Sequence, residues 1–252
     1  GLSDLIWMIQ YNAGLYAYVN LRLRNKTNGR FFGYAIGSTV RNLGGNPNVN
    51  PNLTAKKIGD FNGDGNIDIV WMYGSLYDFK AYVALGDGQG HFTDKTSMSR
   101  VGSYQKYYRA NRREFSDFQN LVADVNNDGL SDLIWMSSDN KGVYAAVALA
   151  LEPDSSGVIF NFAIDRRLSQ DNFSATPNFV TKLLGDVNGD GVIDLIYSFS
   201  GAGYNFEGDR PYHSLGIGAY YAIGRGDGTF HDAISDGTMA ANLKYIFRVE
   251  GG

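Results

Sequence analysis

An acidic nine-residue motif recurs along this chain at nearly constant intervals. Three complete copies with the pattern Asp-x-Asn-x-Asp-Gly-x-x-Asp begin at Asp60, Asp124 and Asp186, and each runs directly into an apolar segment. Residues 1–8 match the second half of a fourth copy. Self-similarity at a fixed period indicates an architecture assembled from one supersecondary unit, so the spacing constrains the fold more strongly than the composition does.

The last Asp of each copy measures the repeat. These residues are Asp4, Asp68, Asp132 and Asp194, separated by 64, 64 and 62 residues, and 62 more lead from Asp194 past residue 252 round to Asp4. We therefore expect a single domain over residues 1–252, made of four repeats of about 63 residues and closed into a ring. The segment 242–250 resembles the strand before each motif, and we expect it to complete the first unit by pairing with the segment after Asp4.

Each unit also holds a strand that ends in a Gly-rich turn followed by an aromatic residue, as in 82–92 and 221–230. This arrangement is typical of a β-hairpin. A unit then has four strands, named A to D here: A enters the acidic loop, B leaves it, C ends at the Gly turn and D follows. The sequence predicts an all-β fold, a β-propeller with four blades of four antiparallel strands, and the abundance of Gly agrees with many tight turns.

The acidic motif and the Gly turn together resemble the FG-GAP repeat, also called the VCBS or integrin-type propeller repeat. The resemblance covers the whole chain and implies a calcium-binding β-propeller, for which seven blades are common. Four repeats depart from that number. Either four blades close alone, which the spacing favours, or the chain is a piece of a larger propeller.

The acidic loops have the composition of a calcium site. Ca²⁺ takes six to eight oxygen ligands, and side chains at alternate positions of a tight loop converge on one point. Gly at position 6 allows the sharp turn, and position 7 offers its carbonyl oxygen. We predict three structural calcium ions, with ligands Asp60, Asn62, Asp64, Asn66 and Asp68; Asp124, Asn126, Asp128, Leu130 and Asp132; and Asp186, Asn188, Asp190, Val192 and Asp194.

An EF-hand and a turn without a metal are the two alternatives to this type of calcium loop. An EF-hand needs Glu at position 12 and flanking helices, but position 12 is Trp71, Trp135 or Tyr197 within apolar strands. An Asn/Gly/Asp turn without a metal is the other alternative. Three loops in register, each with three carboxylates that would repel one another without a cation, favour the metal.

The fourth loop, read across the two ends of the chain, lacks this composition. Its ligand positions are Arg248, Glu250, Gly252 and Asp4. Because Arg stands where the first Asp should be, we expect no ion there.

The acidic A–B loops and the C–D Gly turns are expected on one rim of the ring, and the B–C and D–A connections on the opposite rim. The connections of this opposite rim vary most in sequence, and rigid scaffolds carry binding sites on such variable loops. Aromatic side chains mixed with Asn, Asp, Glu and Arg suit carbohydrate, although solvated loops with anchored aromatics would look similar. The candidate ligand-binding residues are Tyr204, Asn205, Glu207, Asp209, Arg210, Tyr212, His213, Tyr107, Tyr108 and Arg109. Trp7, Trp71 and Trp135 lie inside strand B, and we expect them in the core rather than in a ligand site.

The net charge of −4 gives no reason to expect a nucleic-acid partner, and no apolar run is long enough for membrane insertion. Three Asn-x-Ser/Thr sequons agree with a secreted or cell-surface location. The sequence leaves the oligomeric state open. It also predicts no catalytic residue, since there is no Cys and the three His are scattered, although His213 lies near Glu207 and Asp209.

These features predict a calcium-stabilised binding module, lectin-like or otherwise engaged in cell-surface recognition, with a glycan or glycoprotein as partner. The resemblance extends to propeller lectins of the same type. Two alternatives stay open: an enzyme acting on polysaccharide, a lyase or glycosidase, at the variable rim, or a non-catalytic module of a larger toxin or adhesin.

Overall fold

The computed structural model describes residues 4–11, 14–27, 30–42, 55–75, 78–102, 121–139, 142–152, 159–161, 163–168, 178–200 and 217–235. Within these ranges the chain forms β-strands and no helix, so none of them contains a helix that could span a membrane. The prediction of an all-β fold is confirmed.

The strands form successive antiparallel sheets, called sheets 1 to 4 in chain order. Sheet 2 contains β6 (Ala55–Gly59), β7 (Asp68–Ser75), β8 (Asp78–Gly86) and β9 (Phe92–Gly102). Sheet 3 contains β10 (Leu121–Ala123), β11 (Asp132–Asp139), β12 (Gly142–Ala148) and β13 (Ile164–Arg167). Sheet 4 contains β14 (Asn178–Gly185), β15 (Asp194–Ser200), β16 (Ile217–Ala222) and β17 (Ile234–Ser235).

Sheet 1 differs from the other three. Its described strands are β1 (Leu5–Tyr11), β2 (Gly14–Asn20) and β5 (Ile36–Asn42), in the order β1-β2-β5. A separate hairpin of β3 (Arg22–Thr27) and β4 (Arg30–Phe32) is inserted between β2 and β5. The segment 242–250, predicted as the fourth strand of this sheet, lies outside the described residues, as does the predicted pairing of the two chain ends.

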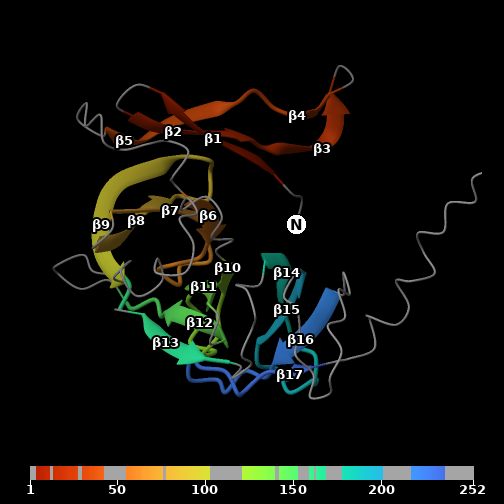
Figure 1. The fold of residues 1–252 in the computed structure, drawn as a ribbon. Helices are drawn as coiled ribbons and strands as arrows, with labels where there is room; N and C mark the ends of the chain where they lie inside the picture. The colour runs from red at the N-terminus through yellow and green to blue at the C-terminus, as the bar shows by residue number, and fades with distance from the viewer. Residues whose placement is uncertain are drawn as a thin grey trace, which may run out of the picture.

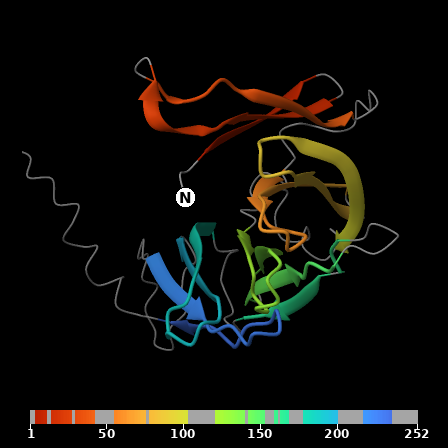
Figure 2. The same ribbon diagram turned by 180° about the vertical axis from the view of Figure 1, so that it is seen from behind.

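The four sheets follow one another around a common centre in the order of the sequence (Figures 1 and 2). The first strands of sheets 2, 3 and 4 meet there, since β10 contacts both β6 and β14. In each of these sheets the strands run in sequence order from the centre outward, as β6-β7-β8-β9 does in sheet 2. This is the arrangement of a β-propeller, and the predicted A-to-D order of strands is confirmed.

The hydrophobic core lies between neighbouring sheets. The middle strands are apolar on both faces, because each face packs against another sheet. On β7, Ile69 and Trp71 pack against sheet 1, while Val70 and Met72 pack against sheet 3. A third cluster joins sheets 3 and 4 through residues such as Ile134 and Tyr197. Near-continuous apolar runs such as the one after Asp132 therefore follow from burial on both sides.

The tryptophans divide into two groups. Trp71 and Trp135 are 3 % and 2 % exposed, which confirms the prediction that they belong to the core. Trp7 is 56 % exposed, contrary to that prediction. Each of the two buried tryptophans packs against the sheet that precedes its own in the chain.

Candidate metal centre

The three acidic loops connect the first and second strands of sheets 2, 3 and 4, and they lie beside one another. The backbone N–H of Ser131 in the second loop donates to the carbonyl oxygen of Asp60 in the first, at 2.7 Å. The side-chain amide of Asn127 reaches the carbonyl oxygen of Gly191 in the third loop at 3.4 Å. The loops therefore form one continuous acidic rim at this end of the sheets.

Each loop is wrapped around the carboxylate at its first position. Asp60 accepts the N–H groups of Gly63 and Gly65 at 2.7 and 2.8 Å, one on each oxygen. Asp186 accepts the N–H groups of Gly189 and Gly191 in the same way, at 2.7 and 2.9 Å. These bonds hold the turn in a tight curve with the first carboxylate on its inner side.

The side chains at positions 3 and 5 lie against each other in all three loops. The amide of Asn62 donates to Asp64 at 3.0 Å, and the corresponding Asn–Asp distance is 2.8 Å in each of the other two loops. Asp64 also accepts the N–H of Asn66 at position 7, at 2.8 Å. Hydrogen bonds therefore connect positions 1, 3, 5 and 7 within one short turn.

The donor set fits a hard cation. Each loop offers carboxylate and amide oxygens near its surface, and an oxygen that accepts one N–H keeps a second lone pair. In the described part of the chain, no three acidic or imidazole side chains alone lie close enough to hold a metal ion. Asn and backbone oxygens would therefore have to complete each set, which is the mixture that Ca²⁺ accepts.

The Asp at position 9 has a second role that the sequence did not reveal. Asp68, Asp132 and Asp194 are fully buried. One carboxylate oxygen of Asp132 accepts the N–H of Val125 in its own loop at 2.9 Å, and the other accepts the N–H of Ala150, just beyond β12, at 2.8 Å. Asp68 and Asp194 make the equivalent pairs of bonds. Each of these residues therefore ties the acidic loop to the end of the third strand of its sheet.

The same bond occurs in sheet 1, where no ion was predicted. Asp4 accepts the backbone N–H of Arg22, just beyond β2, at 2.6 Å. The position-9 carboxylate therefore serves the hairpin even where the rest of the acidic loop differs. An Asp placed directly before a buried apolar strand is the sequence signal that could have indicated this role.

Burial changes the proton affinity of these carboxyls. Desolvation raises the pKa of Asp68 to about 6, and the nearby charges of Asp64 and Asp60 act in the same direction against the backbone hydrogen bonds. Desolvation likewise raises the pKa of Asp132 to about 7, with the charges of Asp128 and Asp124 adding to it. Burial is the main cause of both pKa shifts, and a bound cation would offset the smaller part that comes from the loop carboxylates.

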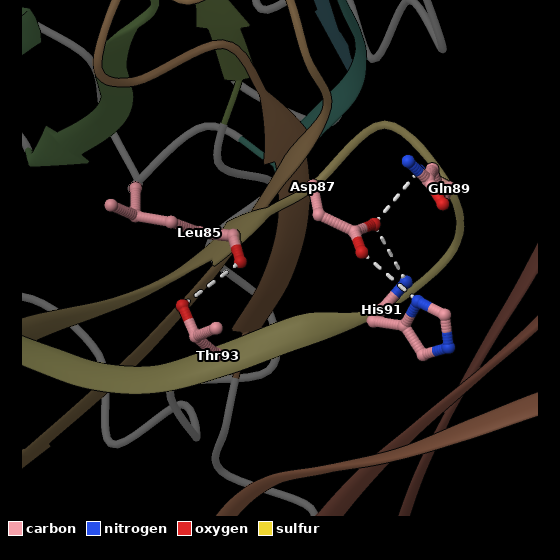
Figure 3. Close-up of polar contacts among 5 residues, drawn as sticks. All are labelled: Leu85, Asp87, Gln89, His91 and Thr93. Carbon is pink, nitrogen blue, oxygen red and sulfur yellow. Dashed lines mark hydrogen bonds and ion pairs between the residues drawn. The ribbon is translucent and has the colours of Figure 1, made fainter.

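The Gly-rich turn between β8 and β9 lies beside the first acidic loop, and Figure 3 shows the polar contacts within this turn. Asp87 accepts the N–H groups of Gln89 and His91 at 2.7 and 3.1 Å, and its other oxygen lies 2.9 Å from Nδ1 of His91. A Cβ on Gly88 would lie 2.3 Å from Oδ1 of Asn66, so turn and acidic loop are in contact. The exposed Asp87–His91 pair was not predicted, although His four residues after Asp in a Gly-rich turn could have indicated it.

A protein-family model matches the segment that contains the first two complete acidic loops. A family model described as the FG-GAP-like repeat matches residues 60–135. Residues 60–135 thus resemble the FG-GAP-like repeat. They run from the first acidic loop through sheet 2 to β11, and so include two of the three loops. No curated protein sequence matches the chain.

Solved structures of similar shape extend the comparison to most of the chain. A lectin from Agrocybe aegerita, described by its specific recognition of non-reducing terminal N-acetylglucosamine, superposes with a TM-score of 0.51 at 18 % identity, over 92 % of this chain and 51 % of the lectin chain. The rhamnogalacturonan lyase YesW gives 0.38 at 15 % identity, over 88 % of this chain and 43 % of its own. The chain therefore spans about half the length of the lectin chain. At this identity the lectin match shows the fold.

Two glycine positions of the acidic loops allow a matched test of loop geometry. Position 6 is Gly in all three loops with φ between 79° and 88°, whereas position 4 is Asn127 in one loop with φ 58° and Gly189 in another with φ 78°. A Cβ on Gly189 or Gly191 would meet nothing within 4 Å, so only backbone strain is at issue. We expect Gly191→Ala to lower the free energy of unfolding by about 1–2 kcal/mol, and Gly189→Asn to change it by less than about 0.5 kcal/mol. Urea unfolding of both variants measures this, and equal losses would contradict the assigned geometry.

The candidate ligand-binding residues of the opposite rim lie in 103–120 and 201–216, outside the described residues. Arg248, Glu250 and Gly252 of the fourth loop lie outside them as well. The residues predicted as calcium ligands all lie within the described parts of the three acidic loops, and calcium binding by them stays a prediction.

Proposed function

We propose that this chain is a calcium-stabilised β-propeller module that binds glycans through the loops opposite the acidic rim. The observation that carries the proposal is the likeness to a lectin over 92 % of the chain. A glycan or glycoprotein is the proposed partner, and the proposed location is the cell surface or the extracellular space. Free calcium is abundant there, and extracellular modules bind it with dissociation constants of about 10⁻⁴–10⁻³ M.

Calcium has a structural role in this proposal. Residues at positions 1, 3, 5, 7 and 9 of each complete loop would hold one ion, which supplies positive charge among carboxylates that otherwise repel one another. The position-9 Asp already joins the loop to the third strand through backbone hydrogen bonds. An ion held by the same loop would therefore stiffen the hairpin and leave the opposite rim open for a partner.

A glycan array probed in calcium buffer and again with a chelator tests the function. Glycans ending in non-reducing N-acetylglucosamine are the first probes, because the lectin of similar fold is described by that specificity. We expect retention of a defined glycan class in calcium and weaker retention in chelator. A folded protein at high concentration that retains no glycan in calcium would contradict the proposal, and release of unsaturated uronate or reducing sugar would favour an enzyme instead.

Aromatic residues of the variable loops give a more local prediction. We expect Tyr107→Ala and Tyr212→Ala each to weaken glycan binding about tenfold, which corresponds to about 1.4 kcal/mol, through loss of stacking on the sugar ring. Tyr34→Ala is the matched control, since Tyr34 is 84 % exposed and belongs to neither loop. Titration calorimetry with the best array glycan measures all three. Unchanged affinity in both loop variants would place the glycan elsewhere.

A further inference from the structure

Two of the three acidic loops contain the dipeptide Asn-Gly at positions 3 and 4, which is a chemically reactive pair. The pairs are Asn62–Gly63 in the first loop and Asn188–Gly189 in the third. In the second loop, Asn126 at position 3 is followed by Asn127 instead. The three loops therefore compare the same position with and without the reactive sequence.

The reaction of such a pair is deamidation through a cyclic imide. The backbone nitrogen of the following residue attacks Cγ of Asn, so the N–Cγ bond forms, the Cγ–Nδ2 bond breaks, and ammonia leaves with the proton of the former N–H. Water then hydrolyses one of the two carbonyl–nitrogen bonds of the ring, which gives either Asp or isoaspartate, whose backbone runs through the former side chain. Glycine after Asn favours the attack because it places no Cβ beside the approaching atoms.

The closed loop holds the attacking nitrogen. In the third loop, the N–H of Gly189 donates to Oδ1 of Asp186 at 2.7 Å. In the first loop, the N–H of Gly63 donates to Oδ1 of Asp60 at the same distance of 2.7 Å. A hydrogen bond to a carboxylate is charge-assisted and strong, and it must break before the nitrogen is free to attack. The first carboxylate of each loop therefore opposes the reaction.

The closed loop also holds the side chain that would be attacked. The amide of Asn188 donates to Oδ2 of Asp190 at 2.8 Å, and its Oδ1 accepts the backbone N–H of Asp190 at 3.0 Å. Asn62 makes the same two bonds with Asp64, at 3.0 and 3.1 Å. Attack requires the face of the side-chain amide to turn toward the glycine nitrogen, and both bonds oppose this rotation.

We propose that Asn62 and Asn188 are sites of spontaneous deamidation, suppressed while the acidic loop is closed and released when it opens. Asn188 and Gly189 are exposed, so water reaches the cyclic imide as soon as it forms. This modification occurs in the loops of the proposed calcium sites, but it needs no bound ion, since the contacts that control it lie within the chain.

Deamidation makes a transient opening of the loop permanent. Conversion of Asn188 to Asp replaces the amide that donates to Asp190 at 2.8 Å by a second carboxylate, so a hydrogen bond becomes a repulsion between like charges. Isoaspartate adds one atom to the backbone of a turn that the bond from Gly191 to Asp186, at 2.9 Å, holds closed. A loop that has reacted therefore no longer closes in its original form.

Peptide mapping by mass spectrometry measures the fraction of each Asn that is converted during incubation in chelator at neutral pH. It also resolves the Asn-Gly pair at 28–29, which lies outside the described residues. In the urea-unfolded chain, we expect Asn62 and Asn188 to convert faster than Asn126, which is not followed by Gly. In the folded chain, we expect both to convert at least about tenfold more slowly than in urea, the factor that one hydrogen bond to a charged group supplies.

Two variants of the third loop test the cause of the protection. Asp186→Ala removes the acceptor of Gly189, so we expect Asn188 to convert about tenfold faster in the folded chain. Asn62, in the unaltered first loop, should keep its rate. Gly189→Asn copies the second loop, where Asn127 has φ 58°, and a Cβ at this position would meet nothing within 4 Å. We expect this variant to stay folded and to convert Asn188 more slowly than the parent chain.

Four results would contradict the proposal: equal conversion in the folded and unfolded chain, an unchanged rate of Asn188 in Asp186→Ala, an equal rise at Asn62 in that variant, and conversion of Asn188 in Gly189→Asn at the parent rate. If circular dichroism shows that Asp186→Ala does not fold, Asp186→Asn replaces it, since it removes the charge and keeps an accepting oxygen, with the same direction of change expected. All incubations contain chelator, so a failure here is separate from a failure of calcium binding, which would appear as identical unfolding curves in calcium and in chelator.

Discussion

Removal of calcium from a solution that holds it at one hundred times the dissociation constant is expected to lower the free energy of unfolding of this chain by about 8 kcal/mol. A ligand that binds only the folded state stabilises it by about 2.7 kcal/mol when its concentration is one hundred times the dissociation constant. Three loops that each bind one ion give three times this stabilisation, about 8 kcal/mol. For a domain of this size, about 1 kcal/mol corresponds to a shift of roughly 2–4 °C in the melting temperature, so chelation should lower it by some tens of degrees.

Thermal unfolding followed by circular dichroism measures this effect in calcium, in chelator and in magnesium. Magnesium is the ionic control, because it demands octahedral geometry at shorter distances and gives up its water reluctantly. We expect magnesium to restore little of the stability lost in chelator. Identical unfolding curves in calcium and in chelator would contradict the metal sites.

A substitution in one loop measures the contribution of that loop's ion to the stability. Asp128→Asn keeps an accepting oxygen for the N–H of Leu130 but removes one carboxylate from the second loop. We expect the calcium-dependent part of the stability to fall by about one third, close to 2.7 kcal/mol, with two loops unaffected. Asp87→Asn is the matched control, because Asp87 is an exposed carboxylate of the same rim outside the acidic loops. A full calcium effect in Asp128→Asn would mean that this loop holds no ion.

The repeat and its strand order could be predicted because local chemistry determines them. The motif fixes where strand B begins: Asp68, Asp132 and Asp194 are the first residues of β7, β11 and β15. The glycine that the turn requires at position 6 has positive φ in all three loops. Apolar runs on both faces of these strands follow from burial between two sheets, so the number of sheets and their order were also accessible.

Features that depend on distant partners were not predictable. The second hydrogen bond of each position-9 Asp comes from an N–H at the far end of the third strand, 18 residues on for Asp68 and 30 for Asp194. This separation along the sequence varies with the length of the second hairpin, so no fixed spacing marks the donor. The calcium motif by itself explains an Asp at position 9, so the sequence gives no reason to look for a second bond. The repeat pattern likewise specifies neither the inserted hairpin β3–β4 nor the exposure of Trp7.

Replacement of Asp132 by Ala is expected to cost about 2–6 kcal/mol even when no calcium is present. Both carboxylate oxygens of this fully buried side chain accept backbone N–H groups, from Val125 and Ala150. A buried donor left without a partner costs about 1–3 kcal/mol, and the substitution leaves two of them. The measurement is urea unfolding in chelator, so that any lost metal ligation does not contribute.

Asp4→Ala is the matched control, because it removes the corresponding side chain from sheet 1. Asp4 is exposed and its bond to the N–H of Arg22 can be replaced by water, so a loss below about 1 kcal/mol is expected. Asp132→Asn should fall between the two, since the amide keeps one accepting oxygen. If Asp132→Ala is as stable as Asp4→Ala in chelator, the position-9 carboxylate contributes through the metal alone. A loss that persists without calcium would mean that the position-9 carboxylate holds the hairpin through its backbone hydrogen bonds, in addition to its proposed part in binding the ion.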